Sequence, residues 1–199
     1  MGVAVIILAA GGSSRLGRAK QLLPVHGKSL LRRSVEAAVQ SRAARCFVVL
    51  GSEASACATE VADLPAEVVV HSLWRNGMAS SIRAGVQAAR RSYPELEAVV
   101  IALCDQPYLD ASVINGLIEA WRASSCSIVA SEYAGHRGAP ALFSAVQLDR
   151  LEALSGEGGA RSLFQAESSD VASVPFPLGG VDVDTEADYA SVTQAAVPG

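Results

Sequence analysis

Short uninterrupted apolar runs alternate with longer amphipathic segments along the first half of the chain. Residues 3–8, Val-Ala-Val-Ile-Ile-Leu, carry no polar side chain, as expected of a strand buried on both faces of a parallel sheet. Residues 28–40 place leucine and valine on one side and charged side chains on the other, which is the pattern of a helix lying on a core. We therefore expect strands and helices to alternate from the N-terminus onward.

The same alternation continues along the chain. Strands are expected at residues 3–8, 45–51, 67–71, 97–104 and 126–133. Helices are expected at residues 28–40, 53–63, 111–123 and 144–154, with another opening at residues 76–85 and a terminal one entered from residues 180–189. Residues 135–140 are expected to form a hairpin-like turn. This order predicts an α/β fold with a Rossmann-like, doubly wound and mostly parallel sheet, helices on both faces, and ligands beyond the carboxyl ends of the strands.

Composition narrows the class of protein. The 199 residues, half of them hydrophobic, fit a single domain over residues 1–199. The net charge is −4 and no long basic run occurs, so a nucleic-acid partner is not expected. The apolar run at residues 3–8 is too short to span a membrane and no basic region precedes it, which predicts a cytoplasmic protein. The four cysteines form no Cys-x-x-Cys pair, so neither a zinc site nor a disulfide framework is expected.

The segment after the first strand is the main candidate for binding phosphates. It carries glycines at positions 11, 12 and 17 and the cations Arg15, Arg18 and Lys20. Glycines let the backbone approach a ligand, and the start of a following helix would favour an anion. The segment does not match Gly-x-Gly-x-x-Gly, and Arg18-Ala19 stands where the other phosphate loop needs Lys-Ser/Thr. On the glycines alone, a turn that only joins strand to helix remains an alternative.

Further candidates for chemistry each have a structural alternative. Asp105 follows a buried strand directly, where a carboxylate needs a partner such as a divalent cation, but it is also placed to cap the next helix or to form an Asx turn. Ser80 or Ser81 could cap a helix or contact a nucleotide. Asp184 or Thr185 suits a helix cap, an explanation that leaves out Asp182.

Several motifs together resemble one family. Residues 8–17, Leu-Ala-Ala-Gly-Gly-Ser-Ser-Arg-Leu-Gly, with Lys-Gln-Leu-Leu-Pro at 20–24, look like the signature loop of nucleotidyltransferases. Within them the chain is most similar to the MobA-like branch that activates molybdopterin, the molybdenum cofactor cytidylyltransferases and their guanylyltransferase relatives. Further matching segments are Trp-x-x-Gly-Met-x-Ser-Ser at 74–81, Asp-Gln-Pro at 105–107, Gly-x-Arg-Gly-x-Pro at 135–140 and Asp-x-Asp-Thr-x-x-Asp-Tyr at 182–189. The resemblance runs from about residue 3 to residue 189.

The resemblance implies a set of site residues. In the family the loop backbone holds the nucleoside triphosphate, and the matching Arg15 and Lys20 contact its phosphates and act in catalysis together with Asp105. The nucleotide-binding residues implied are Leu8, Ala9, Ala10, Gly11, Gly12, Ser13, Arg15, Lys20, Gly77, Met78, Ser80 and Ser81.

The resemblance also implies a metal and an acceptor site. Asp105 and Asp184, with Asp182 as the second choice, would hold Mg²⁺, with Mn²⁺ as an alternative. His136, Arg137 and Arg161 would meet the acceptor. At residues 156–161 the family usually has Gly-Asp-x-Gly-Ala-Arg, and Glu157 departs from it by one methylene, which puts an acidic role there in doubt.

The activity implied is transfer of CMP from CTP to the terminal phosphate of molybdenum-loaded molybdopterin, with release of pyrophosphate. The segment at 74–81 favours CTP over GTP. Rival hypotheses are the guanylyltransferase, another transferase acting on a sugar or alcohol phosphate, and a non-catalytic cofactor carrier or chaperone for a molybdenum hydroxylase. A transient contact with such a hydroxylase is the one protein partner implied. A Rossmann-type dehydrogenase is disfavoured by the missing Gly-x-Gly-x-x-Gly.

Overall fold

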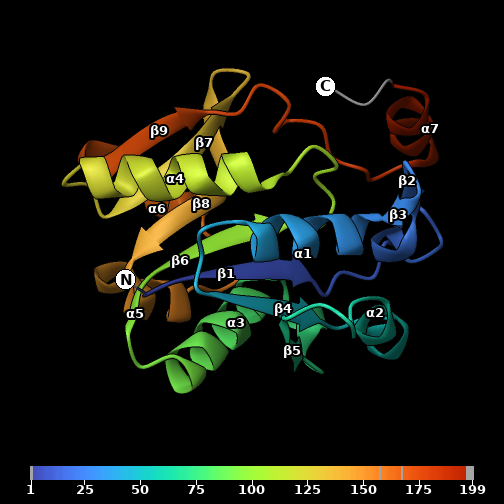
Figure 1. Cartoon of the computed structure of the whole chain (residues 1–199), viewed down its shortest axis with the longest axis horizontal. Coiled ribbons are helices and arrows are strands. Elements are labelled where there is room, and N and C mark those ends of the chain that lie inside the picture. The colour runs from blue at the N-terminus through green and yellow to red at the C-terminus, as the bar shows by residue number, and fades with distance from the viewer. Residues whose placement is uncertain (1, 157, 167, 196–199) are drawn as a thin grey trace.

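The strands of the computed structural model form one large sheet. Within residues 2–156, 158–166 and 168–195, which are the residues that the structure describes, this sheet has seven strands in the order β5-β4-β1-β6-β8-β7-β9 (Figure 1). The strands are β1 (Gly2–Ala9), β4 (Arg45–Leu50), β5 (Glu67–Val70), β6 (Leu96–Leu103), β7 (Ile128–Tyr133), β8 (His136–Ser144) and β9 (Val171–Pro175). Only β8, which lies between β6 and β7, pairs antiparallel with its neighbours in this sheet. The expected α/β fold with a mostly parallel sheet is confirmed.

Helices cover both faces of the sheet (Figure 1). One face carries α1 (Leu30–Gln40), α2 (Ala54–Glu60) and α4 (Ala111–Ala123), and the other carries α3 (Met78–Ser92), α5 (Leu148–Glu152) and α6 (Arg161–Ala166). The terminal helix is α7 (Glu186–Gln194), and a small hairpin is formed by β2 (Pro24–Val25) and β3 (Lys28–Ser29). Short 3₁₀ helices are η1 (Lys20–Leu22), η2 (Trp74–Asn76), η3 (Ala145–Gln147) and η4 (Ser168–Asp170).

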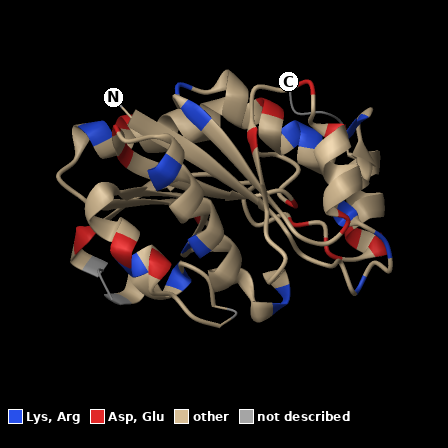
Figure 2. Ribbon diagram, turned by 90° about the horizontal axis from the view of Figure 1, so that it is seen from below, with Lys and Arg blue, Asp and Glu red and all other residues tan. Residues whose placement is uncertain are grey.

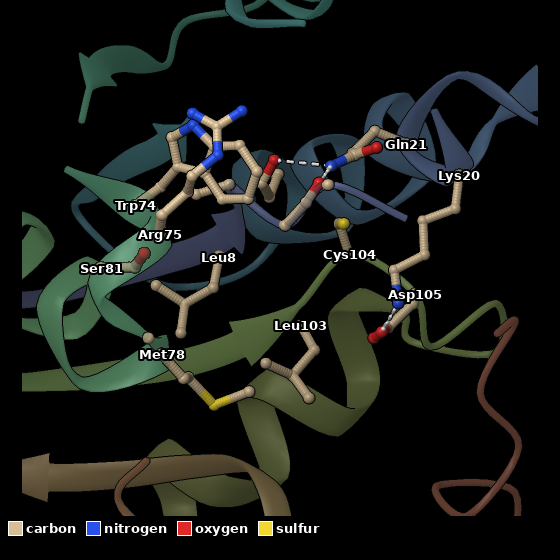
Figure 3. Close-up of a pocket in the computed structure, with 15 residues that line it drawn as sticks. Leu8, Lys20, Gln21, Trp74, Arg75, Met78, Ser81, Leu103, Cys104 and Asp105 are labelled. Atoms are coloured by element: carbon tan, nitrogen blue, oxygen red, sulfur yellow. Dashed lines mark hydrogen bonds and ion pairs between the residues drawn. The ribbon is translucent and has the colours of Figure 1, made fainter. Parts of the chain in front are cut away.

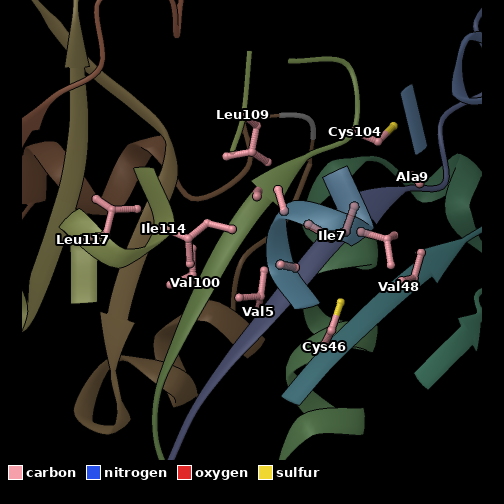
Figure 4. Packing of buried hydrophobic residues seen from close by; sticks show 14 of the residues in the cluster. Val5, Ile7, Ala9, Cys46, Val48, Val100, Cys104, Leu109, Ile114 and Leu117 are labelled. Atoms are coloured by element: carbon pink, nitrogen blue, oxygen red, sulfur yellow. The ribbon is translucent and has the colours of Figure 1, made fainter. Parts of the chain in front are cut away.

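The central strand β1 has no polar side chain at residues 3–8 because both of its faces are buried. Val3, Val5 and Ile7 pack toward α1 and α4 (Figure 4), while Ile6 and Leu8 pack toward α3. Burying a side chain of this size stabilises the fold by about 1.5–3 kcal/mol relative to leaving it exposed. Two-sided burial therefore fixes β1 at the centre of the sheet, with the glycine-rich segment at its carboxyl end.

Side-chain caps fix where the helices begin, and they settle several structural alternatives. The cap of α4 is Asp110, whose carboxylate accepts a hydrogen bond from Val113 N at 3.0 Å, so Asp105 does not cap that helix. The cap of α7 is Thr185, in a reciprocal capping box with Asp188. Gly77 stands at the cap position of α3 and has no side chain. Capping therefore does not account for Asp105 or for the two serines that follow Gly77.

The region between residues 134 and 175 differs from the expected pattern. The expected turn at 135–140 is confined to its first residue, and residues 136–144 form strand β8. The expected helix at 144–154 is divided into η3 and α5. Strand β9 and the β2–β3 hairpin were not anticipated. Gly138 and Pro140 resemble turn residues in the sequence, but pairing with β6 and β7 outweighs this local preference. Glu157 lies outside the described residues.

Charged side chains lie mostly on helices and connecting segments, and the middle of the sheet is free of them along most of its length (Figure 2). This distribution agrees with the two hydrophobic layers that pack on the sheet. Across the part of the chain that the structure describes, no helix combines the length and apolar character needed to cross a bilayer.

The C-terminal segment returns to the loop that follows β1. A third hydrophobic cluster joins the two segments; its buried members are Leu16, Leu23, Val25, Leu30, Val183 and Val192. The Tyr189 hydroxyl donates to Pro24 O at 2.8 Å, and Val183 N donates to Asp105 O at 3.0 Å. α7 and the β2–β3 hairpin accordingly lie side by side in Figure 1. This packing brings the acidic residues before α7 to the carboxyl end of β6.

Candidate active site

A cavity of about 560 Å³ opens at the carboxyl ends of β1 and β6 (Figure 3). Its wall comes from the loop after β1, from η1 and η2, from the start of α3 and from the end of β6. We call it the nucleotide cavity, after the ligand that the sequence predicts for these residues. The residues predicted from the sequence that line it are Leu8, Ala9, Ala10, Gly11, Gly12, Lys20, Gly77, Met78, Ser81 and Asp105. The topology thus brings together three segments that are far apart in the sequence.

Three of the predicted nucleotide-binding residues lie outside this wall. The Ser80 hydroxyl donates to Gly77 O at 2.8 Å and lies 2.9 Å from His71 Nε2. Ser13 accepts a hydrogen bond from Lys20 N through its hydroxyl at 3.0 Å. Arg15 is exposed and forms an ion pair with Asp184. In this structure Ser13 and Ser80 therefore make structural contacts, and Arg15 lies at the rim.

The loop offers unused backbone donors to the nucleotide cavity. Among the described residues, no backbone acceptor takes the N–H groups of Ala10, Gly11 or Gly12. A Cβ atom at Gly12 would come within 2.7 Å of the Trp74 indole, so a larger residue here would require the indole to shift. Successive N–H groups without a protein acceptor are suited to binding phosphate oxygens.

Trp74 and Arg75 also line the nucleotide cavity, and neither was among the site residues predicted from the sequence. The Trp74 indole packs against Gly12 and against Gly51, at the end of β4. The Arg75 guanidinium lies 4.4 Å from the centre of the indole ring. Trp74 belongs to the motif at residues 74–81 and could have been found there, whereas Arg75 carries no signal in the sequence.

Lys20 joins two carboxylates that come from distant parts of the chain. Its Nζ atom lies 2.5 Å from Asp105 Oδ2 and 2.8 Å from Asp184 Oδ1, and Arg15 lies 2.7 Å from Asp184 Oδ2. Burial alone would lower the pKa of Lys20, but Asp105 and Asp184 outweigh it and hold that pKa above its usual value. For Asp184, burial acts to raise the pKa, and Lys20 and Arg15 outweigh this and hold it below its usual value. Lys20 and Asp184 are therefore both charged at neutral pH.

The pair of carboxylates fits a divalent cation. Asp105 Oδ1 is buried and has no hydrogen-bond partner among the described residues. The same carboxylate converges with Asp184 on a single cationic atom, Lys20 Nζ. Within the described part of the chain no group of three or more metal-ligating side chains occurs. Mg²⁺ commonly binds to one or two carboxylates and completes its shell with substrate phosphates and water, so two carboxylates are a sufficient set.

A second cavity, of about 430 Å³, adjoins the first, and Leu8, Met78 and Leu103 line both. We call it the acceptor cavity, after the acceptor that the sequence predicts for some of its residues. Part of its wall is apolar and includes the stacked rings of Phe143 and Phe164, whose centres are 6.0 Å apart. The residues predicted to meet the acceptor, His136, Arg137 and Arg161, all line this cavity. A ligand with an anionic group and a flat body would match such a wall.

Asp182 lines the acceptor cavity as well. Burial of its carboxylate, together with the nearby charges of Asp105 and Asp184, raises the pKa of Asp182 to about 6. Unlike Asp184, it makes no ion pair among the described residues. The structure thus separates the two aspartates, with Asp184 beside Lys20 and Asp182 in the wall of the acceptor cavity.

Three further side chains at the site, all buried or half-buried, were not among the site residues predicted from the sequence. Gln106 donates from Nε2 to Ala139 O at 2.9 Å and to Gly179 O at 2.8 Å, which ties β8 to the segment before α7. Tyr133 lines the acceptor cavity. Gln21 lines the nucleotide cavity and is 1% exposed. Gln21 and Gln106 stand inside recognised motifs, but only the fold shows what their amides bind.

Comparisons with known proteins show which family the chain belongs to. Residues 5–171 match the model of the MobA-like NTP transferase domain. The chain is 31% identical over 189 residues to nicotine blue oxidoreductase from Paenarthrobacter nicotinovorans, covering 90% of this chain and 91% of that protein.

Solved structures show the same fold. Rv0371c from Mycobacterium tuberculosis H37Rv superposes with a TM-score of 0.84 at 29% identity, over 98% of this chain and 100% of that one. The same protein in complex with manganese gives a TM-score of 0.81 at 27% identity, again over 98% and 100%. Molybdopterin-guanine dinucleotide biosynthesis protein A from Archaeoglobus fulgidus shares the fold, with a TM-score of 0.70 at 19% identity over 96% and 97% of the two chains. The family match covers most of the chain, including the glycine loop and Asp105, so the chain belongs to the family of MobA-like NTP transferase domains and is a nucleotidyltransferase of that type.

Proposed function

We propose that this protein transfers CMP from CTP to the terminal phosphate of molybdenum-loaded molybdopterin and releases pyrophosphate. The observation that carries the proposal is the position of Asp105 and Asp184. Both contact Lys20 Nζ, beside a glycine loop with free N–H groups, and Asp105 borders the acceptor cavity through its neighbour Gln106. A nucleotide and a second substrate could therefore meet at the two carboxylates.

The nucleotide cavity matches the needs of a triphosphate. The N–H groups of Ala10 and Gly12 can bind phosphate oxygens, and Lys20 supplies a charge in the same wall. Arg15 forms an ion pair with Asp184 and adds a second cation beside that carboxylate. The base would lie toward Gly77, Met78 and Ser81, whose motif in the sequence supports CTP.

In the reaction a phosphate oxygen of the acceptor attacks the α-phosphorus of CTP. The bond from this phosphorus to the bridging oxygen breaks, and pyrophosphate leaves with the electron pair. A divalent cation held by Asp105 and Asp184 would neutralise negative charge that develops on the phosphates. Lys20 and Arg15, released from the carboxylates, stabilise the departing pyrophosphate, while the loop fixes its orientation. The acceptor is a phosphate monoester already ionised at neutral pH, so no side chain has to act as a general base.

Support for the acceptor comes from the acceptor cavity. Arg137 and Arg161 can meet an anionic ligand, and the rings of Phe143 and Phe164 offer a surface for a flat heterocycle. Contact with a molybdenum hydroxylase that receives the product is proposed from the family resemblance. Manganese in the Rv0371c complex supports the use of a divalent cation, Mg²⁺ or Mn²⁺.

A second candidate function follows from the relative named nicotine blue oxidoreductase. The apolar wall of the acceptor cavity, with the rings of Phe143 and Phe164, would accept another aromatic ligand as well as a pterin. Against it, the glycine loop lacks the Gly-x-Gly-x-x-Gly pattern of a dinucleotide-binding fold.

The test is pyrophosphate release with Mg²⁺ or Mn²⁺, comparing CTP, GTP, ATP and UTP, with and without molybdenum-loaded molybdopterin. We expect release with CTP only when the pterin is present. Preference for GTP would contradict the cytidylyl assignment. Binding of the pterin without turnover of any nucleotide would identify a carrier. Oxidation of a reduced nicotinamide in a parallel assay, without pyrophosphate release, would support the oxidoreductase.

A further inference from the structure

The side chain of Gln21 is buried and makes hydrogen bonds to the glycine loop that follows β1. It is 1% exposed, and its Nε2 atom donates to Ala9 O at 3.0 Å and to Gly11 O at 2.6 Å. Its Oε1 atom accepts a hydrogen bond from the Ser13 hydroxyl at 3.3 Å. Carbonyl oxygens only accept hydrogen bonds, so the amide can be oriented in one way only, with the NH₂ group toward the loop. All of the polar atoms of Gln21 are satisfied by this loop.

These bonds set the direction of the loop's peptide groups. In a trans peptide the C=O of one residue and the N–H of the next point in opposite directions. Because the carbonyls of Ala9 and Gly11 point to Gln21, the N–H groups of Ala10 and Gly12 point away from it. Ala10 and Gly12 both lie in the wall of the nucleotide cavity, and their N–H groups have no backbone acceptor among the described residues.

The same network reaches Lys20. The Ser13 hydroxyl donates to Gln21 and accepts from Lys20 N at 3.0 Å. Ser13 itself has a positive φ of 51°, a conformation that costs energy for a residue other than glycine and needs support from its surroundings. Gln21 therefore supports the strained residue Ser13 as well as the two peptide groups whose carbonyls accept its hydrogen bonds.

We propose that Gln21 is a positioning residue that holds the glycine loop in the conformation that presents the N–H groups of Ala10 and Gly12 to the phosphates of the nucleotide. This rests on the proposed function, because it takes the loop as a binding site for a nucleoside triphosphate. Gln21 does not touch the substrate in this role. Without it, the two carbonyls would be free to turn, and a carbonyl turned toward the cavity would repel a phosphate.

The test compares Gln21→Met with Gln147→Met. Methionine has nearly the same length as glutamine but cannot donate to the two carbonyls. Gln147 is a matched control, since it is 4% exposed, donates from Nε2 to the Ser127 hydroxyl at 2.7 Å and lines neither cavity. The affinity for CTP and for inorganic tripolyphosphate is measured by calorimetry without metal, together with the melting temperature. A Ser13→Ala variant provides a milder change, because it removes only the hydroxyl that contacts Gln21 and Lys20.

We expect Gln21→Met to bind both ligands about 10- to 100-fold more weakly than the wild type, in line with the loss of two hydrogen bonds that orient donors. Ser13→Ala should lose less affinity, in the same direction. Gln147→Met should lower the melting temperature by a similar amount while leaving both affinities within about twofold of the wild type. In steady state, the KM for CTP should rise and the KM for the acceptor should not.

Equal affinities in the wild type and Gln21→Met would overturn the inference while leaving the proposed function intact. An equal loss of affinity in Gln147→Met would also overturn it, because the loss in Gln21→Met would then reflect a general loss of stability. If Gln21→Met does not fold, unchanged affinities in Ser13→Ala would be decisive against the inference. A wild-type protein that binds neither CTP nor any other triphosphate would instead overturn the proposed function, and the role of Gln21 with it.

Discussion

The nucleotide cavity and the acceptor cavity adjoin each other, but different parts of the chain build them. The nucleotide cavity is lined by residues 8–12, 20–21, 74–75, 77–78, 81 and 103–105, and the loop contributes mainly backbone and small side chains. The acceptor cavity takes larger side chains from strands, helices and connections spread between residues 8 and 182. A backbone site binds what all nucleotides share, their phosphates, whereas a wall of side chains can select one acceptor.

The carboxylates lie where the two regions meet. Asp105 lines the nucleotide cavity, Asp182 lines the acceptor cavity, and Asp184 contacts the Lys20 of the loop. The comparison therefore predicts three classes of variant. Changes at the carboxylates should affect the whole reaction, changes in the loop should affect the nucleotide, and changes in the acceptor cavity should affect only the acceptor.

The largest effect is expected from Asp105→Asn. This change removes a negative charge from the proposed metal site, where charge neutralisation supports the transfer step, so the rate of pyrophosphate release should fall at least about 100-fold. Asp149→Asn is the control, because Asp149 lies on the surface in an ion pair with Arg90. Turnover within a few-fold of the wild type in Asp105→Asn would show that this carboxylate holds no metal needed for catalysis.

Smaller effects are expected from Lys20→Met, which should strengthen Mn²⁺ binding and weaken CTP binding. Lys20 neutralises Asp105 and Asp184 in the absence of ligands, so its removal should strengthen Mn²⁺ binding to the free protein. The same change should weaken CTP binding about 10-fold, because the triphosphate loses a cation. Electron paramagnetic resonance titration of Mn²⁺ and calorimetry with CTP measure the two effects.

Lys28→Met is the control for that prediction, since Lys28 pairs with Glu36 away from the nucleotide cavity. Weaker binding of both Mn²⁺ and CTP in Lys20→Met would contradict this prediction. The lysine would then act by maintaining the fold of the loop, and it would not compete with Mn²⁺ for the carboxylates.

Arg137→Ala should weaken binding of the acceptor and leave binding of CTP unchanged. We expect the KM for the acceptor to rise about 10-fold while the affinity for CTP stays within twofold, because Arg137 lines the acceptor cavity and not the nucleotide cavity. Arg42→Ala, at a surface pair with Glu119, is the control. An equal loss of CTP affinity in Arg137→Ala would mean that the two cavities do not act separately.

The smallest effect is expected from Asp170→Asn, on stability. The Ser127 hydroxyl and Ser127 N donate to the Asp170 carboxylate and hold its pKa below the usual value. A lowered pKa stabilises the fold above the usual aspartate pKa, and this contribution is lost as the pH falls toward the pKa of the folded state. We expect Asp170→Asn to lose about 1 kcal/mol at pH 7.

Urea unfolding at pH 7 and at pH 3 measures this effect. The difference between wild type and Asp170→Asn should shrink at pH 3, because the carboxyl group of the wild type is then closer to protonation, and CTP affinity at pH 7 should be unchanged. A gap that is constant with pH would show that the charge of Asp170 contributes nothing.

Much of the first half of the chain could be predicted from the sequence. The run Val3–Leu8 has no polar position, so only a strand buried on both sides accommodates it, and the glycines and cations that follow are contiguous. The doubly wound arrangement then places that loop at the carboxyl edge of the sheet. The likeness of residues 74–81 and 105–107 to family motifs pointed to further segments, and the fold brings them to the same cavity.

The acceptor side was less predictable. Residues 136–140 look like a turn because they contain Gly138 and Pro140, yet they belong to β8 between β6 and β7. Strand β9 is short and only partly buried over most of its length, so it has no clear apolar run. Their positions depend on pairing with strands distant in the sequence, which no local pattern reports.

The sequence by itself determined the buried strand, the glycine-rich loop after it and the family, because each of these depends on residues that are neighbours in the chain. Only the tertiary structure decided that Asp184 meets Lys20 across 164 positions, that Thr185 and not Asp184 caps α7, and that Gln21 holds the loop from below. The physical reason is that a hydrogen bond or ion pair depends on atoms within about 3 Å of each other. Packing of the whole chain sets that distance for residues far apart in sequence.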